Sequence, residues 1–478
     1  MVEIMSENVK KASVHEVDMT NGSLFKKILI FSLPLMATGI LQLLFNAADM
    51  VVVGQFVSET ALAAVGSTGS LAGLIVNFFM GLAAGAGVVM SKHYGSKDSE
   101  SADRLLHTAM PISLISGIVV MIFGLIFSRD LLILMNTEGE CLELATQYLV
   151  IYFIGAPFNL VYNFGASMLR ATGDTVRPLF YLTLAGVINI IVNLIAVLVL
   201  NQGVRGVAYA TIVSQLISAV LVVLALRKNK GFIKLSLRKI KIYKQSTLDI
   251  IRLGVPSGVQ SSLFAISNMI IQATINGFGE IAMAGTAAAR QLESFLYVAL
   301  NAVANGAVTA VGQNYGAKNY KRIRKSIYDC LILVTATGLI GGLAMFLFNE
   351  PLVRLYTKTP EATAIGVERL NFFIVVYVLC GIMDVINCSM RGMGFSFTPM
   401  AIVLIGTCVM RVGWIYLVFP HSPTLLNVYI SYPVSWILTA AVGFVVLLFM
   451  IKKREKRDAV LGGKNAFCNT EKISEQSG

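Results

Sequence analysis

The sequence predicts an all-α polytopic membrane protein, with twelve transmembrane helices in two pseudo-symmetric six-helix lobes. Hydrophobic residues make up 56% of the 478 residues and charged residues only 13%, whereas a soluble domain carries roughly 25% charged residues. Apolar runs of at least ~18 residues, long enough to cross a ~30 Å hydrocarbon core as a helix, recur along the whole chain. The second half of the sequence also repeats the first, which predicts the two lobes.

The apolar runs define the predicted spans and the polar segments between them. The spans cover residues 28–54, 61–90, 105–128, 144–169, 178–200, 203–226, 248–275, 281–311, 326–348, 366–390, 399–420 and 424–451. The resulting domains are an N-terminal tail (1–22), an N-lobe (23–226), a basic linker (227–247), a C-lobe (248–451) and a C-terminal tail (452–478). The polar ends, 1–21 and 452–478, are expected to be disordered. No cleavable signal peptide is expected, because the first 27 residues are polar and the first apolar run is too long for one.

The distribution of positive charge predicts the orientation in the membrane. With the N-terminus in the cytoplasm, 30 of the 38 Lys and Arg residues fall in cytoplasmic segments. The outer loops then hold only Arg129, Arg205, Arg354, Lys358 and Arg369. Cytoplasmic loops are enriched in Lys and Arg, so the chain is expected to lie in the plasma membrane with both termini cytoplasmic. The net charge of +12 follows from this bias and from attraction to anionic lipids, and no nucleic-acid partner is expected.

The internal repeat holds its register over about 150 residues. At an offset of 221, Arg170 matches Arg391 and Pro178 matches Pro399, and the loops "HYGSKD" and "NYGAKN" align. Because each half has an even number of spans, the two halves enter the membrane in the same sense, with a cavity expected between them. The pairs Gly69/Gly73 and Gly81/Gly85 are expected to allow close helix packing within a lobe.

These features indicate a secondary transporter. The sequence has no GxxxxGK[ST] loop for ATP, and no HExxH or GxSxG motif, so the protein is not expected to be an enzyme. The six cysteines and four histidines form no cluster with metal-ligand spacing, so no metal site and no disulfide framework are expected.

Asp49 is the first candidate for a coupling residue. It lies in a run with no other charge from Ile28 onward, and it shares a helix face with Gln42 and Asn46. Such carboxylates usually face a protein interior or a wet cavity and often mark an ion pathway. Burial favours the neutral form and a nearby cation favours the charged form, so Asp49 is suited to bind and release H⁺ or Na⁺. The alternative is a structural aspartate, hydrogen-bonded to neighbouring Asn and Thr side chains.

Spans 5 and 6 offer neighbours for Asp49. Asn189 and Asn193 lie one turn apart on one face of span 5, and Thr211 lies in span 6. Their oxygens suit Na⁺ and a protonated carboxyl equally well. The same residue types are also common as hydrogen bonds between membrane helices.

The second half carries a longer set of polar residues. A stripe along span 8 comprises Arg290, Ser294, Tyr297, Asn301 and Asn305, with Glu293 beside it; Asp384 and Arg411 follow in spans 10 and 11. A polar face of this length is expected to line a water-filled cavity. Arg290 with Glu293, and Asp384 with Arg411, are expected either to form structural ion pairs or to take part in coupling or substrate binding.

The chain resembles the multidrug and toxic compound extrusion (MATE) family. The resemblance rests on "LPLMATGILQLLFNAADMVVVG", "INIIVN…GVAYAT", the repeated "YG[AS]K[DN]" loops and "LRATGD…RP", and it extends from about Ser23 to Lys453. It implies an antiporter that needs no cofactor and exports lipophilic organic cations in exchange for H⁺ or Na⁺. It is expected to function as a monomer in the lipid bilayer.

The resemblance also implies site residues. Asp49, Asn189 and Thr211 match the N-lobe cation site of one prokaryotic branch, but Asn193 stands where that branch usually has a second Asp. A branch coupled through acids of the C-lobe points instead to Glu293 and Asp384. The span 7 acid of that branch is missing, since Ile271, the repeat partner of Asp49, is apolar.

The expected mechanism is alternating access by rocking of the two lobes, in which H⁺ or Na⁺ binds Asp49 from outside and the drug is released. The main alternative is a lipid-linked oligosaccharide flippase of the same superfamily, which tends to carry several cationic residues in its cavity. Among the span residues only Arg290 and Arg411 qualify. A channel is disfavoured because no ring of ligands resembles a selectivity filter.

Overall fold

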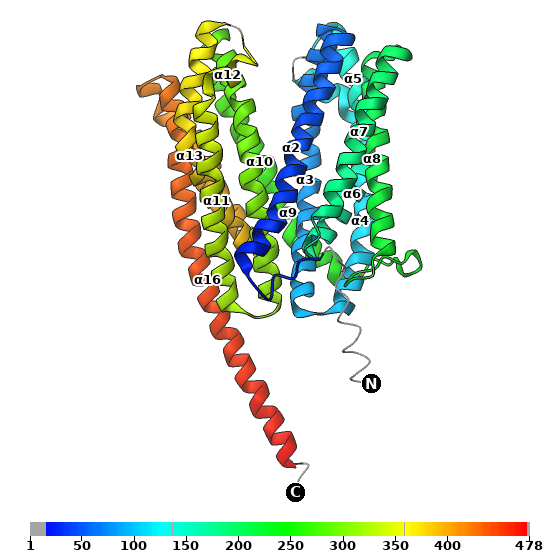
Figure 1. Ribbon diagram of the computed structural model, residues 1–478, viewed down its shortest axis with the longest axis vertical. Helices are drawn as coiled ribbons and strands as arrows, with labels where there is room; N and C mark the ends of the chain where they lie inside the picture. Colours follow the sequence, from blue (N-terminus) through cyan, green and yellow to red (C-terminus); the bar gives the residue numbers. More distant parts are fainter. Residues whose placement is uncertain (1–15, 136, 358, 476–478) are drawn as a thin grey trace.

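The computed structural model describes residues 16–135, 137–357 and 359–475. All regular elements in these ranges are helices. The helices of residues 59–228 form one group, and those of residues 280–475 form a second. The two groups lie side by side and diverge toward the end opposite the chain termini (Figure 1). Ten stretches in the described part of the chain are long and apolar enough to cross a membrane, and one bent pair of helices forms an eleventh.

The bounds of the helices follow the predicted spans but extend beyond most of them. They are α2 (Leu24–Phe56), α3 (Glu59–Ser96), α4 (Ser99–Leu134), α5 (Gly139–Ile154), α6 (Ala156–Ala171), α7 (Val176–Leu194), α8 (Gly203–Lys228), α9 (Lys244–Asn276), α10 (Glu280–Gly316), α11 (Tyr320–Leu347), α12 (Asn349–Arg354), α13 (Pro360–Gly392), α14 (Phe397–Val403), α15 (Met410–Leu417) and α16 (Leu425–Glu475). The π-helical turn η1 (Ile195–Val199) extends α7, and η3 (Leu404–Val409) joins α14 to α15.

Two of the predicted spans have an unexpected form. Span 4 is the pair α5 and α6, which meet at an angle of 48°. Gly155 lies at the bend, where a Cβ would come within 2.4 Å of Gln215 Oε1. Span 7 is α9, which has 33 residues and is more polar than the ten apolar stretches. Counting α9 and the bent pair, the prediction of twelve transmembrane helices agrees with the structure.

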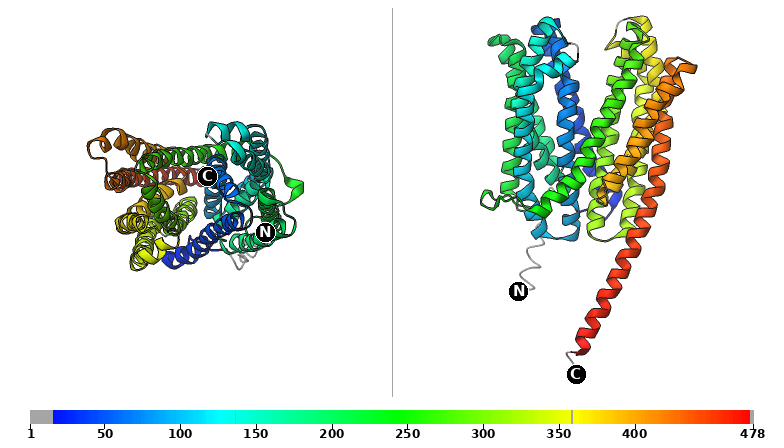
Figure 2. Two further views of the ribbon diagram at one scale, coloured as in Figure 1. Left: turned by 90° about the horizontal axis from the view of Figure 1, so that it is seen from above. Right: turned by 180° about the vertical axis from the view of Figure 1, so that it is seen from behind.

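The helices α2 and α9 each begin against one group and end in the other (Figure 2). Leu24 and Ile28, at the start of α2, pack with Leu300 of α10, whereas Val53, near its end, packs with Val207 of α8. The helix α9 does the reverse: its start packs against the core of α3, α4 and α6, and its end packs against α15 and α16. The two groups are therefore tied together at the end near the termini.

Four glycines bring α3 and the first half of α9 into close contact. A Cβ on Gly81 of α3 would lie 2.3 Å from the backbone nitrogen of Gly258 in α9, and a Cβ on Gly85 would lie 2.5 Å from that of Gly254. The prediction that Gly81 and Gly85 allow packing within a lobe is therefore wrong, because they pack against α9, which belongs to the predicted C-lobe.

The other glycine pair of span 2 contributes no such contact. A Cβ on Gly69 would meet nothing within 4 Å, and one on Gly73 would meet only Asn77 of the same helix. The expected close packing at these two positions is also wrong.

The repeated loops have the same geometry in both halves. Lys97 and Lys318 both adopt left-handed backbone conformations, with φ of 57° and 55°. The next residue caps the following helix in each case: Asp98 accepts from Ser101 N at 3.0 Å, and Asn319 accepts from Arg322 N at 3.1 Å. The hydrogen bonds from Ser101 hold the pKa of Asp98 below its usual range.

The segment before α2 is ordered where it is described, contrary to the expectation of a disordered tail. Met19 is fully buried, and its backbone nitrogen donates to Gln313 Oε1 at 2.8 Å. Gln313 Nε2 in turn donates to Ala171 O at 3.0 Å. The segment thus passes between the two groups at their converging end, and buried backbone groups that find such partners hold it in place. Residues 1–15 of the predicted tail lie outside the described residues.

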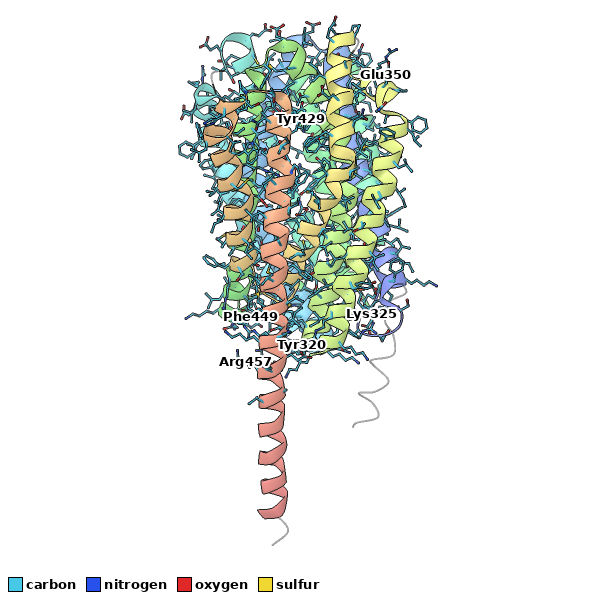
Figure 3. The ribbon with its side chains drawn as sticks, turned by 90° about the vertical axis from the view of Figure 1, so that its left-hand side faces the viewer. Tyr320, Lys325, Glu350, Tyr429, Phe449 and Arg457 are labelled. Carbon is cyan, nitrogen blue, oxygen red and sulfur yellow. The ribbon has the colours of Figure 1, made fainter. Side chains whose placement is uncertain are left out.

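The C-terminal tail is also helical rather than disordered as far as Glu475, and residues 476–478 lie outside the described residues. The helix α16 continues to Glu475 and projects beyond the bundle (Figure 1). Figure 3 shows it leaving the bundle near Tyr320, whose hydroxyl donates to Asp458 Oδ2 at 2.6 Å. An ion pair between Arg324 and Glu455 adds a second contact. The Lys, Arg and Glu residues after Ile451 are good helix formers, so the helix does not end with the apolar run.

Candidate functional site

The structure brings Asp49 of α2 together with the two asparagines of α7. Asn193 Nδ2 donates to Asp49 Oδ1 at 2.6 Å. Asn193 is fully buried and Asn189, one turn earlier, is 5% exposed. The Oδ1 atoms of both asparagines are buried without a hydrogen-bond partner in the described part of the protein. The π-helical turn η1 begins two residues after Asn193, and such turns are frequent at functional sites.

Thr211 and Tyr148 complete this N-lobe site. Thr211 Oγ1 donates to Val207 O of its own helix at 3.1 Å. Tyr148 of α5 lies beside Thr211 and near the charge of Asp49. Sequence reasoning missed Tyr148, because its approach to Asp49 depends on how α5 packs, and its spacing from Tyr152 was the available signal.

The site is acidic and rich in oxygen atoms. None of the described Lys, Arg or His side chains forms an ion pair with Asp49. One carboxylate and two unpartnered amide oxygens are the kind of ligands that a hard cation prefers. A proton on Asp49 would equally find an acceptor among these amide oxygens. No group of three or more His, Cys, Asp and Glu suited to a metal ion occurs in the described residues.

The structure gives Glu293 a different partner from the one expected. Arg369 of α13 donates to it through two hydrogen bonds, Nε to Oε1 at 2.7 Å and Nη2 to Oε2 at 2.9 Å. Both side chains are almost completely buried, at 3% and 4% exposure. The expected pairing with Arg290 is wrong, since Arg290 Nη1 donates to Gln272 Oε1 at 2.7 Å. Arg369 lies within α13, which begins at Pro360, and not in the outer loop to which the charge count assigned it.

Arg411 is buried without a carboxylate partner among the described residues. Its Nε donates to Ser435 Oγ at 2.9 Å, and its guanidinium carbon lies 4.3 Å from the centre of the Tyr432 ring and 5.5 Å from that of Trp436. The expected ion pair with Asp384 is therefore wrong. Aromatic faces and hydroxyl groups replace the carboxylate in stabilising this cation.

A cavity of about 350 Å³ lies between the two groups where they converge. Tyr297, Asn301 and Asn305 of the predicted polar stripe line it, together with Gln42 of α2. Asp384 lies next to Asn301 and Tyr297 but not on the cavity wall. Neither Glu293, Arg290 nor Arg411 reaches the cavity.

Two arginines that the sequence analysis places in cytoplasmic loops line the cavity. Arg170 ends α6 and Arg391 lies in the last turn of α13. They are the pair matched by the internal repeat, so the pseudo-symmetry brings them to the same cavity from opposite groups. The repeat was the signal that could have found them.

Comparison with known proteins agrees with this architecture. A family model described as MatE matches residues 34–195 and 256–417, one stretch in each half. The chain belongs to the MATE family. Members of this family are transporters, and this chain is accordingly a membrane transporter rather than an enzyme.

Several bacterial relatives of this MATE-family chain are similar over most of its length. The probable multidrug resistance protein YoeA of Bacillus subtilis is 26% identical over 445 residues, which cover 91% of this chain and 95% of the relative. The probable multidrug resistance protein NorM of Thermotoga maritima is 25% identical over 440 residues, covering 90% and 93%. The multidrug export protein MepA of Staphylococcus aureus is 22% identical over 376 residues, covering 79% and 81%.

Solved structures show the same fold. An outward-facing conformation of a multidrug resistance MATE family transporter of the MOP superfamily superposes with a TM-score of 0.87 at 25% identity. The match covers 93% of this chain and all of that one. A crystal structure of MATE in the bent conformation gives a TM-score of 0.86 at 25% identity, covering 94% of this chain and 100% of that chain.

Proposed function

We propose that this MATE-family transporter is a secondary active multidrug efflux antiporter, which exports organic cations across the plasma membrane in exchange for H⁺ or Na⁺. Support for efflux comes from relatives described as multidrug resistance and export proteins, which are similar over most of the chain. The proposal places both termini in the cytoplasm, as the distribution of Lys and Arg favours. The transporter is proposed to need no cofactor and to act as a monomer, with a coupling site formed by helices of a single chain.

The observation that carries the proposal is the hydrogen bond of 2.6 Å between Asp49 and buried Asn193, in a site without a basic partner among the described residues. A carboxylate in such a place is costly to keep charged and unpaired. Binding of H⁺ or Na⁺ removes this cost, so the free energy of the site changes with the coupling ion. A residue that served only structure would be better satisfied by a fixed positive partner.

The coupling ion then acts by favouring one arrangement of the two groups of helices. A ligand can shift a conformational equilibrium only through its different affinity for the two states. In the described arrangement the groups converge at the end near the termini. Asn193 and Asn189, one turn earlier on α7, both keep side-chain oxygens without a hydrogen-bond partner among the described residues. Cation binding at these oxygens would alter how α2 packs against α7, and α2 contacts both groups.

The test uses inverted membrane vesicles and the uptake of ethidium, under an imposed pH gradient and, separately, an imposed Na⁺ gradient. Uptake by the wild type is expected to follow one gradient and to be lost in Asp49→Asn. The matched control is Asp329→Asn, which removes a buried acid of α11 outside the Asp49 site and the cavity lining, and it is expected to retain uptake. Uptake by Asp49→Asn at the wild-type rate would contradict the coupling role of Asp49. If the wild type moved no cation under either gradient, the drug-export proposal would fall in favour of the flippase.

A further inference from the structure

The charge on the wall of the central cavity is opposite to what a simple cation site would carry. Its lining comes from α2, α3, α6, α9, α10 and α13, and the charged side chains among the described lining residues are Arg170 and Arg391. No carboxylate from the described residues lines it. An organic cation in this cavity would meet two positive charges and no negative one.

Both arginines have N–H groups without a hydrogen-bond partner among the described residues. The Nε atoms of both are buried and have no partner in the described part of the chain. Arg391 Nη2 donates to the neutral amide Oε1 of Gln260 at 2.6 Å, and Arg170 lies beside the hydroxyl of Tyr162. Neither guanidinium forms an ion pair with an acid of the described residues. Asp384, two turns before Arg391 on α13, interacts with it through space but does not reach the cavity wall.

The positive charge and the unmet N–H donors of the two guanidinium groups both cost free energy in a partly buried cavity. An anion relieves both costs. The planar fork of arginine matches a carboxylate, which accepts two parallel hydrogen bonds from it. The rest of the wall suits an aromatic body, since Leu35, Met80 and Tyr297 offer apolar and aromatic surface next to amides.

We propose that Arg170 and Arg391 form a binding site for a carboxylate of the transported molecule. The favoured cargo is therefore amphoteric, with an acidic group joined to an aromatic, cationic body. This inference rests on the proposed function, because it names part of what the exporter carries. It does not depend on which ion drives transport or on Asp49.

The test measures equilibrium binding to the full chain in detergent micelles, without any gradient, by fluorescence polarisation. The probes are rhodamine B, which has a free carboxylate, and rhodamine B methyl ester, which has the same cationic rings without the acid. The wild type is expected to bind rhodamine B at least about tenfold more tightly than the ester, the ratio expected from one charge-assisted hydrogen-bonded contact.

Variants of the two arginines locate the effect. Arg170→Gln and Arg391→Gln are each expected to weaken binding of rhodamine B about tenfold and to leave binding of the ester unchanged or tighter. Arg170→Lys and Arg391→Lys keep the charge but lose the two-pronged guanidinium. Their affinities for rhodamine B are expected to lie between those of the wild type and the Gln variants. The control Arg354→Gln removes an exposed arginine of the C-lobe, paired on the surface with Glu350, and should change neither affinity. Elution of each variant as a single peak in size-exclusion chromatography shows that it is folded.

The outcomes separate this inference from the proposed function. Equal affinities for the two dyes, tighter binding of the ester by the wild type, or no binding of either dye would overturn the carboxylate site. The same preference in wild type and in the Arg→Gln variants would overturn it as well. Because no ion gradient is present, a loss of coupling in Asp49→Asn changes none of these results, and the vesicle experiment tests antiport on its own.

Discussion

Breaking the buried ion pair between Glu293 and Arg369 should destabilise the C-lobe strongly, whereas replacing both partners with apolar residues should not. The pair has two hydrogen bonds of 2.7 and 2.9 Å, and both side chains are at least 96% buried. Removing one partner of such a pair typically costs about 3–5 kcal/mol, because the other charge is left buried and unpaired. Replacing both with apolar residues of similar volume is often neutral or stabilising.

The surroundings of the pair refine these magnitudes. In Glu293→Gln, Arg369 keeps its contacts with the Phe373 and Tyr429 rings, at 4.8 and 5.1 Å, and such contacts are worth about 0.5–2 kcal/mol. The expected loss is therefore near 3 kcal/mol, the lower end of the range. In Arg369→Gln, the Tyr377 hydroxyl at 3.3 Å is the remaining donor to Glu293. Tyr429 lies in the upper half of α16 (Figure 3), so the loss of stability is expected to extend to α16.

The assay is SDS-induced unfolding followed by tryptophan fluorescence, for which Trp436, 5.5 Å from the Tyr377 ring, is a local reporter. The double variant Glu293→Leu/Arg369→Met is expected to be as stable as the wild type to within about 1 kcal/mol, and to transport ethidium. Single variants that lose less than about 1 kcal/mol would refute the assignment of the pair to stability. A double variant that is stable but does not transport ethidium would indicate that Glu293 takes part in coupling.

Three further predictions follow from contacts elsewhere in the protein. Gly81→Ile is expected to force α3 and α9 apart and to abolish transport, because its Cβ would lie 2.3 Å from the backbone nitrogen of Gly258. Distances between spin labels on α3 and α9 measure this, and wild-type distances with full transport would contradict it. Gln313→Ala leaves the buried N–H of Met19 without its acceptor, at a cost of about 1–3 kcal/mol. The hydrogen-exchange rate of residues 16–22 is therefore expected to rise. An exchange rate equal to that of the wild type would show that the contact is unimportant. Arg411→Met is expected to leave stability unchanged or to raise it by about 1–4 kcal/mol in the SDS assay, because this buried cation has no carboxylate partner in the described residues; a loss of several kcal/mol would show that its aromatic contacts more than offset its desolvation.

Local sequence patterns predicted the helices of this protein and the residues that share a helix face. Apolar runs predicted the helices because a membrane requires each span to satisfy its own backbone hydrogen bonds. The helical repeat placed Asn189 and Asn193 on one face, and the structure brings Asn193 to Asp49, 144 residues earlier in the chain. The duplicated loops predicted two matching halves, and the left-handed residues Lys97 and Lys318 have the same conformation in both.

What the sequence by itself determined is therefore the set of helices, their duplication and the residues that share a helix face. The tertiary structure alone decided which faces meet. Glu293 pairs with Arg369, 76 residues away, rather than with its neighbour on the same helix. Gly81 and Gly85 pack against α9 of the other sequence half, and Arg170 and Arg391 line the cavity instead of lying in loops. The physical reason is that helical periodicity depends on local backbone geometry, whereas the partner of each face depends on how distant helices cross and how tightly they pack.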